Sequence, residues 1–190
     1  MYDAVADPYC YDGTTVLRNI PDLHTQSELD AFEAISTAAR ANLPLPPGRL
    51  SATQYRAIHQ HLFRDVYEWA GRYRTVRLGK DGSAFCYPEH IAHEMTALFA
   101  DLKAKYYLRN RSADAFALAA AEFLAMLNAI HPFREGNGRT QTSFLALLAD
   151  RAGHPLDLDR LERGPFLAAM VASFKGDNTA LVAQIKILIA

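Results

Sequence analysis

The chain has 190 residues, half of them hydrophobic and 22% charged, with a formal net charge of −1. Its length and composition suit one ordinary globular domain with a real core, and they exclude a disordered chain. The near-zero charge excludes general affinity for nucleic acid, which usually needs a basic excess. We expect no apolar run to approach the roughly 18 residues of a membrane span, and the acidic start lacks a signal-peptide pattern.

The two cysteines, Cys10 and Cys86, imply no disulfide framework, so a reducing cytoplasm is the default location. The seven histidines suggest a metal site, but the sequence has no His-x-x-x-His or Cys-x-x-Cys pair on a plausible helix face. His59 and His61 are two residues apart and therefore point to different faces of a helix. The sequence thus argues against a zinc site.

Apolar side chains recur at helical spacing along most of the chain, which predicts an all-α fold. The start signals are capping patterns at Thr25 and Ser51, a first-turn proline at Pro88 and a cap at Ser112. Further helices are predicted near 137–151, 161–174 and 178–189. The helix after Ser112 is rich in alanine and nearly apolar all round, so we expect it to be central.

One stretch has a different pattern. Polar and apolar side chains alternate from Arg72 to Leu78, and a turn at 79–82 and a second short run at 83–87 follow. This pattern predicts a small β-hairpin. Because an isolated hairpin is only marginally stable, it must lean on the helices, and its edge leaves backbone donors and acceptors open to a partner.

The segment His131-Pro-Phe-Arg-Glu-Gly-Asn-Gly-Arg139 joins the apolar helix to the start of the next one. Its two glycines let backbone approach a ligand closely, and the positive end of the following helix, with Arg139, suits a polyphosphate. Glu135 is a natural Mg²⁺ ligand beside phosphates, and His131 suits a general base. Each feature alone is commonly structural, whereas the whole set in one short segment indicates a site.

This segment resembles the signature of the Fic family (filamentation induced by cAMP), His-Pro-Phe-x-Asp/Glu-Gly-Asn-Gly-Arg-x-x-Arg. Residues 62–74 resemble the family's segment before the hairpin, and 80–91 resemble its flap and the helix after it. Residues 11–19 and 28–33 are similar to the Fic toxins of bacterial toxin–antitoxin pairs and to type IV secreted Fic effectors. The resemblance implies the all-α Fic fold, a helical bundle with a small β-hairpin flap, in a single domain, 1–190, with a core at about 51–175 and an N-terminal extension, 1–50.

The resemblance also implies an enzyme, a protein adenylyltransferase that moves AMP from Mg²⁺-ATP to a Tyr, Thr or Ser hydroxyl of a target protein. It makes His131 the general base and Glu135 the Mg²⁺ ligand. The residues implied in nucleotide binding are Phe133, Arg134, Gly136, Asn137, Gly138 and Arg139. The target would dock as an added strand on the flap, which comprises Lys80, Asp81, Gly82, Ser83, Ala84 and Phe85. No nucleic-acid or membrane partner is implied, and the location would be the bacterial cytoplasm, or the host cytosol if the protein is secreted.

The sequence departs from the signature at its last position, where Thr142 replaces arginine. In the family that arginine helps to hold the terminal phosphate and pairs with a glutamate of an inhibitory helix. The chain carries no such inhibitory motif, so the family logic places it on a separate small antitoxin. Two alternatives stay open: a Fic-like phosphotransferase, against which Gly138 argues, and a catalytically weak binding module, which Thr142 favours.

Overall fold

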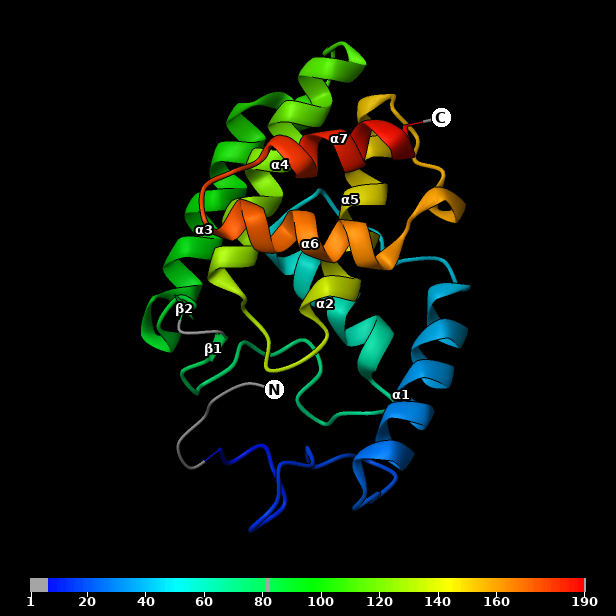
Figure 1. Ribbon diagram of the computed structural model, residues 1–190, viewed down its shortest axis with the longest axis vertical. Helices are drawn as coiled ribbons and strands as arrows, with labels where there is room; N and C mark the ends of the chain where they lie inside the picture. The colour runs from blue at the N-terminus through cyan, green and yellow to red at the C-terminus, as the bar shows by residue number, and fades with distance from the viewer. Residues whose placement is uncertain (1–6, 81–82, 190) are drawn as a thin grey trace. The chain divides into compact units, whose positions relative to one another are not determined.

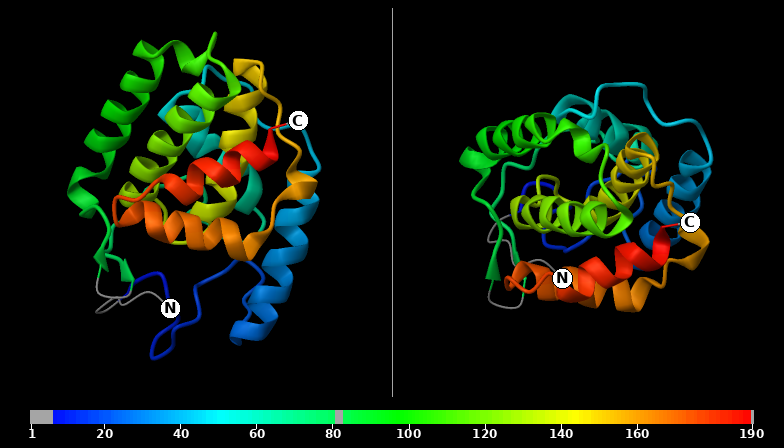
Figure 2. Two further views of the ribbon diagram at one scale, coloured as in Figure 1. Left: turned by 45° about the horizontal axis from the view of Figure 1, so that its top comes forward. Right: turned by 90° about the horizontal axis from the view of Figure 1, so that it is seen from above.

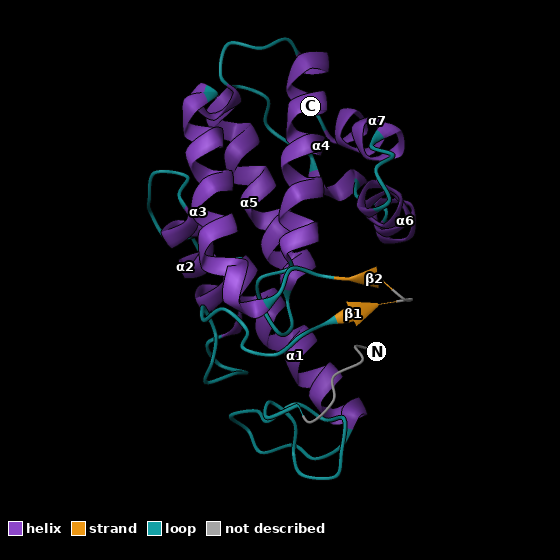
Figure 3. Ribbon diagram, turned by 90° about the vertical axis from the view of Figure 1, so that its left-hand side faces the viewer, coloured by secondary structure: helices purple, strands orange, loops and turns teal. Residues whose placement is uncertain are grey.

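The computed structural model describes residues 7–80 and 83–189, which form two compact units. The first unit contains the described residues of Met1–Ile91 together with Pro132–Thr140, and the second contains those of Ala92–His131 and Gln141–Ala190. Helices make up nearly all the regular structure of this part of the chain, and two short strands form one hairpin (Figure 3). The predicted all-α fold class is therefore confirmed.

The first unit has two helices, α1 (Gln26–Ala41) and α2 (Ala52–Phe63), which pack against each other (Figure 1). Both begin where the sequence predicted, because the hydroxyls of Thr25 and Ser51 accept backbone N–H bonds from residues three positions later. The predicted apolar face of α2 is buried. The predicted apolar face of α1 is only partly buried, since the side chain of Ile35 is 73% exposed.

The hairpin pairs β1 (Gly79–Lys80) with β2 (Ser83–Ala84) in antiparallel register, with Gly79 opposite Ala84 and Lys80 opposite Ser83. A hairpin was predicted at this place and is present. Of the predicted flap residues, Asp81 and Gly82 lie outside the described residues. Lys80 and Ser83 are placed by their backbone alone, and the Phe85 N–H donates to the Leu78 carbonyl at 3.1 Å.

The first strand of the hairpin lies at 79–80 and not, as the alternation predicted, over 72–78, and Arg74 shows the reason. Its backbone N–H donates to the Pro132 carbonyl at 2.9 Å. Its buried guanidinium donates to the carbonyls of Val76, at 2.7 Å, and Cys86, at 2.6 Å. Arg74 thus ties the segments before and after the hairpin to each other and to Pro132. These bonds stand in place of the backbone hydrogen bonds that an extended strand would need.

In the second unit, α4 (Ala113–Ile130) packs against α6 (Arg163–Phe174) and α7 (Thr179–Leu188), and α6 and α7 lie side by side (Figure 2). Most residues of α3 (Pro88–Ala104) and α5 (Asn137–Ala152) also belong to this unit. Short 3₁₀ turns lie at Tyr106–Leu108 and Leu158–Arg160. The predicted helices are therefore present, with ends shifted by at most a few residues.

Helix α4 is the buried core helix that its composition predicted. Its 18 residues include Phe116, Leu124 and Leu127, which are fully buried. By length and by its mean hydropathy of 1.5 it is also the one helix of the described residues that could cross a membrane, so the expectation of no such run was wrong. Half of it is buried inside the structure, as in the core helix of many globular proteins, and the match is therefore weak evidence for a membrane span.

Candidate active site

His131 is the residue that ends α4. Its N–H donates to the Leu127 carbonyl at 3.0 Å, and its backbone is left-handed, with φ 47° and ψ 63°. This conformation is uncommon for a residue other than glycine and closes the helix before Pro132. The residue is 7% exposed. The predicted general base is thus fixed by the end of a core helix, in a backbone conformation of the kind that clusters at functional sites.

Asn137 closes the loop that follows. Its Oδ1 accepts the Phe133 N–H at 3.0 Å, and its Nδ2 donates to the Phe133 carbonyl at 2.8 Å. The side chain is buried, so the amide serves the loop from the first position of α5. Thr140 reinforces the turn with a hydroxyl bond to the Gly136 carbonyl at 2.9 Å. The sequence thus sets the shape of the loop locally, while a contact of Asn137 with phosphate stays a prediction.

Phe133 anchors the loop in an aromatic cluster. Its ring is fully buried and stacks on His59, with centroids 3.8 Å apart, and on Tyr55, at 5.5 Å. Because the ring is fully buried, we expect it to act in a nucleotide site only by holding the neighbouring backbone in place.

His59 supports the loop from α2, a role that the sequence did not indicate. Its Nδ1 accepts the Gly71 N–H at 2.8 Å, so the proton is on Nε2, which donates to the Glu135 carbonyl at 3.0 Å. Burial lowers the pKa of His59 to about 3. A neutral histidine of fixed tautomer therefore links Gly71 to the carbonyl of the predicted metal ligand.

We expect His59 to make the fold sensitive to acid. In an unfolded chain its pKa is about 6.5, whereas in the fold it is about 3. Between these values the unfolded state binds a proton that the folded state does not, so stability falls as pH falls. In this range the free energy of unfolding should fall by about 1.4 kcal/mol for each pH unit. Urea unfolding from neutral to mildly acid pH should show this loss in the wild type and a shallower slope in His59→Gln. Equal slopes would contradict the assignment.

Glu135 has the features of a ligand for a phosphate-bound metal ion. Its Oε1 accepts the Gly136 N–H at 2.8 Å, and within the described residues its Oε2 accepts no hydrogen bond. Burial raises the pKa of this carboxyl, and nearby Glu33 raises it further. No group of three or more His, Cys, Asp or Glu in the described parts of the chain could hold a metal alone. Mg²⁺ is commonly held by one carboxylate together with substrate phosphates, so Glu135 remains the predicted Mg²⁺ ligand.

The two glycines of the loop differ in what requires them. Gly136 has φ +79°, and a Cβ there would lie 2.3 Å from the Phe63 ring, whereas a Cβ at Gly138 would have no atom within 4 Å. Gly136→Ala should lower the free energy of unfolding by about 2–5 kcal/mol, through the left-handed backbone and overpacking. Gly138→Ala should fold normally, so any loss of nucleotide binding in this variant would come from the added methyl group meeting the nucleotide and not from a change in the fold. Equal stabilities of the two variants in urea unfolding would contradict this reading.

Comparison with known proteins decides the family. The model of the Fic/DOC family matches residues 49–149. The chain belongs to the Fic/DOC family. It is 52% identical to the probable protein adenylyltransferase y4lH of Sinorhizobium fredii, over 99% of this chain and 98% of that protein. It is 34% identical to the protein adenylyltransferase VbhT of Bartonella schoenbuchensis, over 97% of this chain but only 39% of VbhT.

A solved structure supports the same assignment. The chain resembles the BepC effector of Bartonella tribocorum with bound AMPPNP, with a TM-score of 0.85, 26% identity and 96% of each chain covered. The Fic fold that the signature implied is therefore confirmed. The likeness extends well beyond the matched segment, 49–149, because it includes the N-terminal part of this Fic domain.

Two motif arginines of this Fic domain have carboxylate partners from its N-terminal part. Arg134 donates to Asp7 at 2.6 Å, with both side chains at most 8% exposed. Arg139 donates to Glu33 at 2.5 Å, lies 3.7 Å from Glu135, and is 34% exposed. The Arg134 guanidinium thus serves a buried ion pair, whereas Arg139 keeps an exposed part. Nucleotide binding stays a prediction for both.

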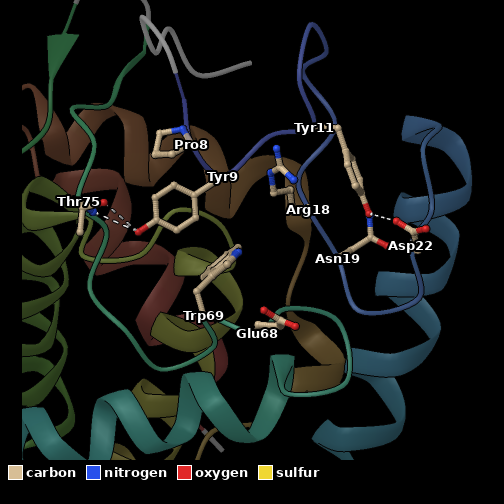
Figure 4. Close-up of a pocket in the computed structure, with 9 residues that line it drawn as sticks. All are labelled: Pro8, Tyr9, Tyr11, Arg18, Asn19, Asp22, Glu68, Trp69 and Thr75. Atoms are coloured by element: carbon tan, nitrogen blue, oxygen red, sulfur yellow. Dashed lines mark hydrogen bonds between the residues drawn. The ribbon is translucent and has the colours of Figure 1, made fainter.

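The Fic domain also has a pocket of about 520 Å³ in its first unit, which none of the predicted site residues lines (Figure 4). Tyr9 and Trp69 form one wall, with their rings edge to face at 5.4 Å, and the Tyr9 hydroxyl accepts the Thr75 N–H at 3.2 Å. The segment before α1 is therefore built into the unit by aromatic and hydrogen-bonded contacts as well as by Asp7.

Proposed function

We propose that this Fic domain, taken as the single domain 1–190, is a protein adenylyltransferase that transfers AMP from ATP to a Tyr, Thr or Ser hydroxyl of a target protein. The observation that carries the proposal is the segment from His131 to Arg139, which holds every residue of the family signature up to that arginine. The relatives named protein adenylyltransferase, at 52% and 34% identity, support it.

The chemistry assigns one role to each part of the segment. The target hydroxyl oxygen attacks the α-phosphorus, and His131 accepts its proton, a contribution of about 10²–10⁴-fold in rate. The bond from the α-phosphorus to the bridging oxygen breaks, and pyrophosphate leaves. The positive end of α5, with Gly136, Gly138 and Arg139, receives the phosphates.

Glu135 is the residue that would hold Mg²⁺, together with the phosphates of ATP. When bound, the ion offsets the negative charge that develops on pyrophosphate. Because burial raises the pKa of Glu135, protons compete more strongly with the metal for this carboxylate as pH falls. Loss of nucleotide affinity on acidification, restored by excess Mg²⁺, would be consistent with this role.

The hairpin is the place where we propose that the target docks. Backbone groups at the edge of β1 and β2 would pair with an extended loop of the target, which positions a hydroxyl without reading much sequence. The protein would act in the bacterial cytoplasm, or in a host cytosol if secreted. A separate small antitoxin with an inhibitory helix is the regulator that the family logic suggests.

Parallel labelling tests the proposed function. The protein is incubated with bacterial lysate and ATP labelled at either the α- or the γ-phosphorus, and the proteins are separated on a gel. Protein-bound label from α-labelled ATP alone is the expected result. Label from γ-labelled ATP alone would replace this proposal with the phosphotransferase alternative. No label, with ATP binding intact, would favour the binding module.

Thr142 should make the enzyme slow. An arginine there would add a charge-assisted hydrogen bond to the terminal phosphate, worth about 1.5–3 kcal/mol. Thr142→Arg should therefore raise the initial rate about ten- to hundredfold at saturating Mg²⁺-ATP. The uncharged Thr142→Gln is the matched control and should stay near the wild-type rate. Arg134 is no ready substitute, because Asp7 holds its guanidinium. An unchanged or lower rate in Thr142→Arg would contradict the prediction.

A further inference from the structure

Helix α1 supplies polar partners to the motif arginine of α5, although α1 lies outside the matched family segment. Glu33 Oε1 accepts from Arg139 Nη2 at 2.5 Å, and Tyr67 donates its hydroxyl to the other oxygen of Glu33. The Glu33 side chain is 12% exposed. Both of its oxygens are therefore engaged, which fixes the carboxylate before any ligand arrives.

A second residue of α1 holds the same guanidinium. Thr37, one turn after Glu33, accepts from Arg139 Nη1 at 3.3 Å. The Thr37 hydroxyl donates its proton to the Glu33 carbonyl at 2.7 Å, so the hydroxyl oxygen is available to accept from Arg139. The Phe63 ring lies 4.6 Å from Arg139 Cζ and supports the guanidinium from α2. Arg139 is thus oriented by two hydrogen bonds, of which the one to Glu33 is also an ion pair, and by an aromatic face.

We infer that Glu33, with Thr37, is a positioning residue that presets Arg139 for the outer phosphates of ATP. The inference rests on the proposed function only in that Arg139 binds phosphate. A guanidinium has five N–H donors, of which these two bonds use two, so donors remain for a ligand. An arginine ordered in advance loses less conformational entropy when the nucleotide binds.

The geometry favours positioning over competition between Glu33 and ATP. A competing carboxylate would have to release Arg139 when the phosphates arrive. Glu33 is nearly buried and bound by Tyr67, so release would leave a buried carboxylate without its cation, which is strongly unfavourable. The carboxylate therefore stays in place and holds the cation while phosphate binds to its other donors.

The test compares the affinities of two probes, a non-hydrolysable ATP analogue and AMP, each with Mg²⁺, by calorimetry. Glu33→Ala should weaken binding of the ATP analogue at least about tenfold and that of AMP less than about twofold, because AMP lacks the outer phosphates. Glu33→Gln keeps an acceptor for Arg139 and should recover most of the loss. Asp30→Ala, which removes an exposed carboxylate from the same helix, is the matched control and should change neither affinity.

A double-mutant cycle separates positioning from a general structural effect. In an Arg139→Ala background, Glu33→Ala should cause no further loss of affinity for the ATP analogue, because there is no guanidinium left to hold. Tyr67→Phe keeps the ring but removes the hydroxyl that donates to Glu33, so it should lower that affinity by less than Glu33→Ala does. It also keeps the inference testable if Glu33→Ala does not fold.

Three results would overturn the inference: equal losses for the ATP analogue and AMP, additive effects in the cycle, or tighter binding of the ATP analogue by Glu33→Ala. The last would mean that Glu33 competes with phosphate. A wild-type protein that binds the analogue but transfers no AMP would defeat the proposed function alone, since the affinity comparison does not depend on turnover.

Discussion

His131→Ala is expected to lower AMP transfer by about 10²–10⁴-fold or more, because it removes the group that accepts the proton of the target hydroxyl. Transfer is measured with α-labelled ATP under single-turnover conditions. Nucleotide affinity should change little, since the phosphates bind to the other residues of the segment.

The matched control for this substitution is set by the backbone. His131 is left-handed, and alanine in that region costs about 1–2 kcal/mol, so Ala alone confounds chemistry with stability. Asparagine tolerates the left-handed region better and also lacks a base. His131→Asn should therefore fold like the wild type and be as inactive as His131→Ala. Full activity in either folded variant would contradict the assignment of the base.

The largest expected effect on stability comes from the buried pair of Asp7 and Arg134. Asp7→Ala removes the carboxylate that pairs with the buried Arg134 guanidinium, which should lower the free energy of unfolding by about 3–5 kcal/mol. The control is Asp12→Ala, which breaks the exposed pair with Arg18 and should cost about 1 kcal/mol or less. Urea unfolding of both variants measures the difference.

A second variant separates the buried charge from a loss of packing. The double variant Asp7→Ala/Arg134→Met removes both charges of this pair, so most of the lost free energy of unfolding should return. If Asp7→Ala unfolds like Asp12→Ala, the N-terminal segment is not held as the ion pair indicates. The double variant also tests nucleotide binding by Arg134, because it should keep its ATP affinity if the guanidinium serves only the fold.

Local signals were enough for the helices. The caps at Thr25, Ser51 and Ser112 act within three residues, and each starts a helix in the structure as the sequence predicted. The strand over 72–78 failed because Arg74 donates its backbone N–H to Pro132, 58 residues later, and its guanidinium to carbonyls of the loop segments around the hairpin. No pattern within 72–78 carries that information.

The candidate site divides in the same way. Its loop was predictable, because His131 to Arg139 is one continuous segment whose residue types indicate phosphate and base chemistry. Its supports were not. His59 and Glu33 act on residues 76 and 106 positions away. In the sequence His59 reads as a histidine on an apolar helix face and Glu33 as an ordinary helix carboxylate, so only the fold shows their partners.

Mass spectrometry of a modified target protein tests the central claim most directly. The protein is incubated with Mg²⁺-ATP and lysate, and the modified target is isolated. The mass added to its Tyr, Thr or Ser side chain is then measured, with His131→Asn run in parallel. The account predicts an adenylyl group that is absent from the His131→Asn reaction. A simple phosphate on the same side chain, or an adenylyl group that persists without His131, would contradict it.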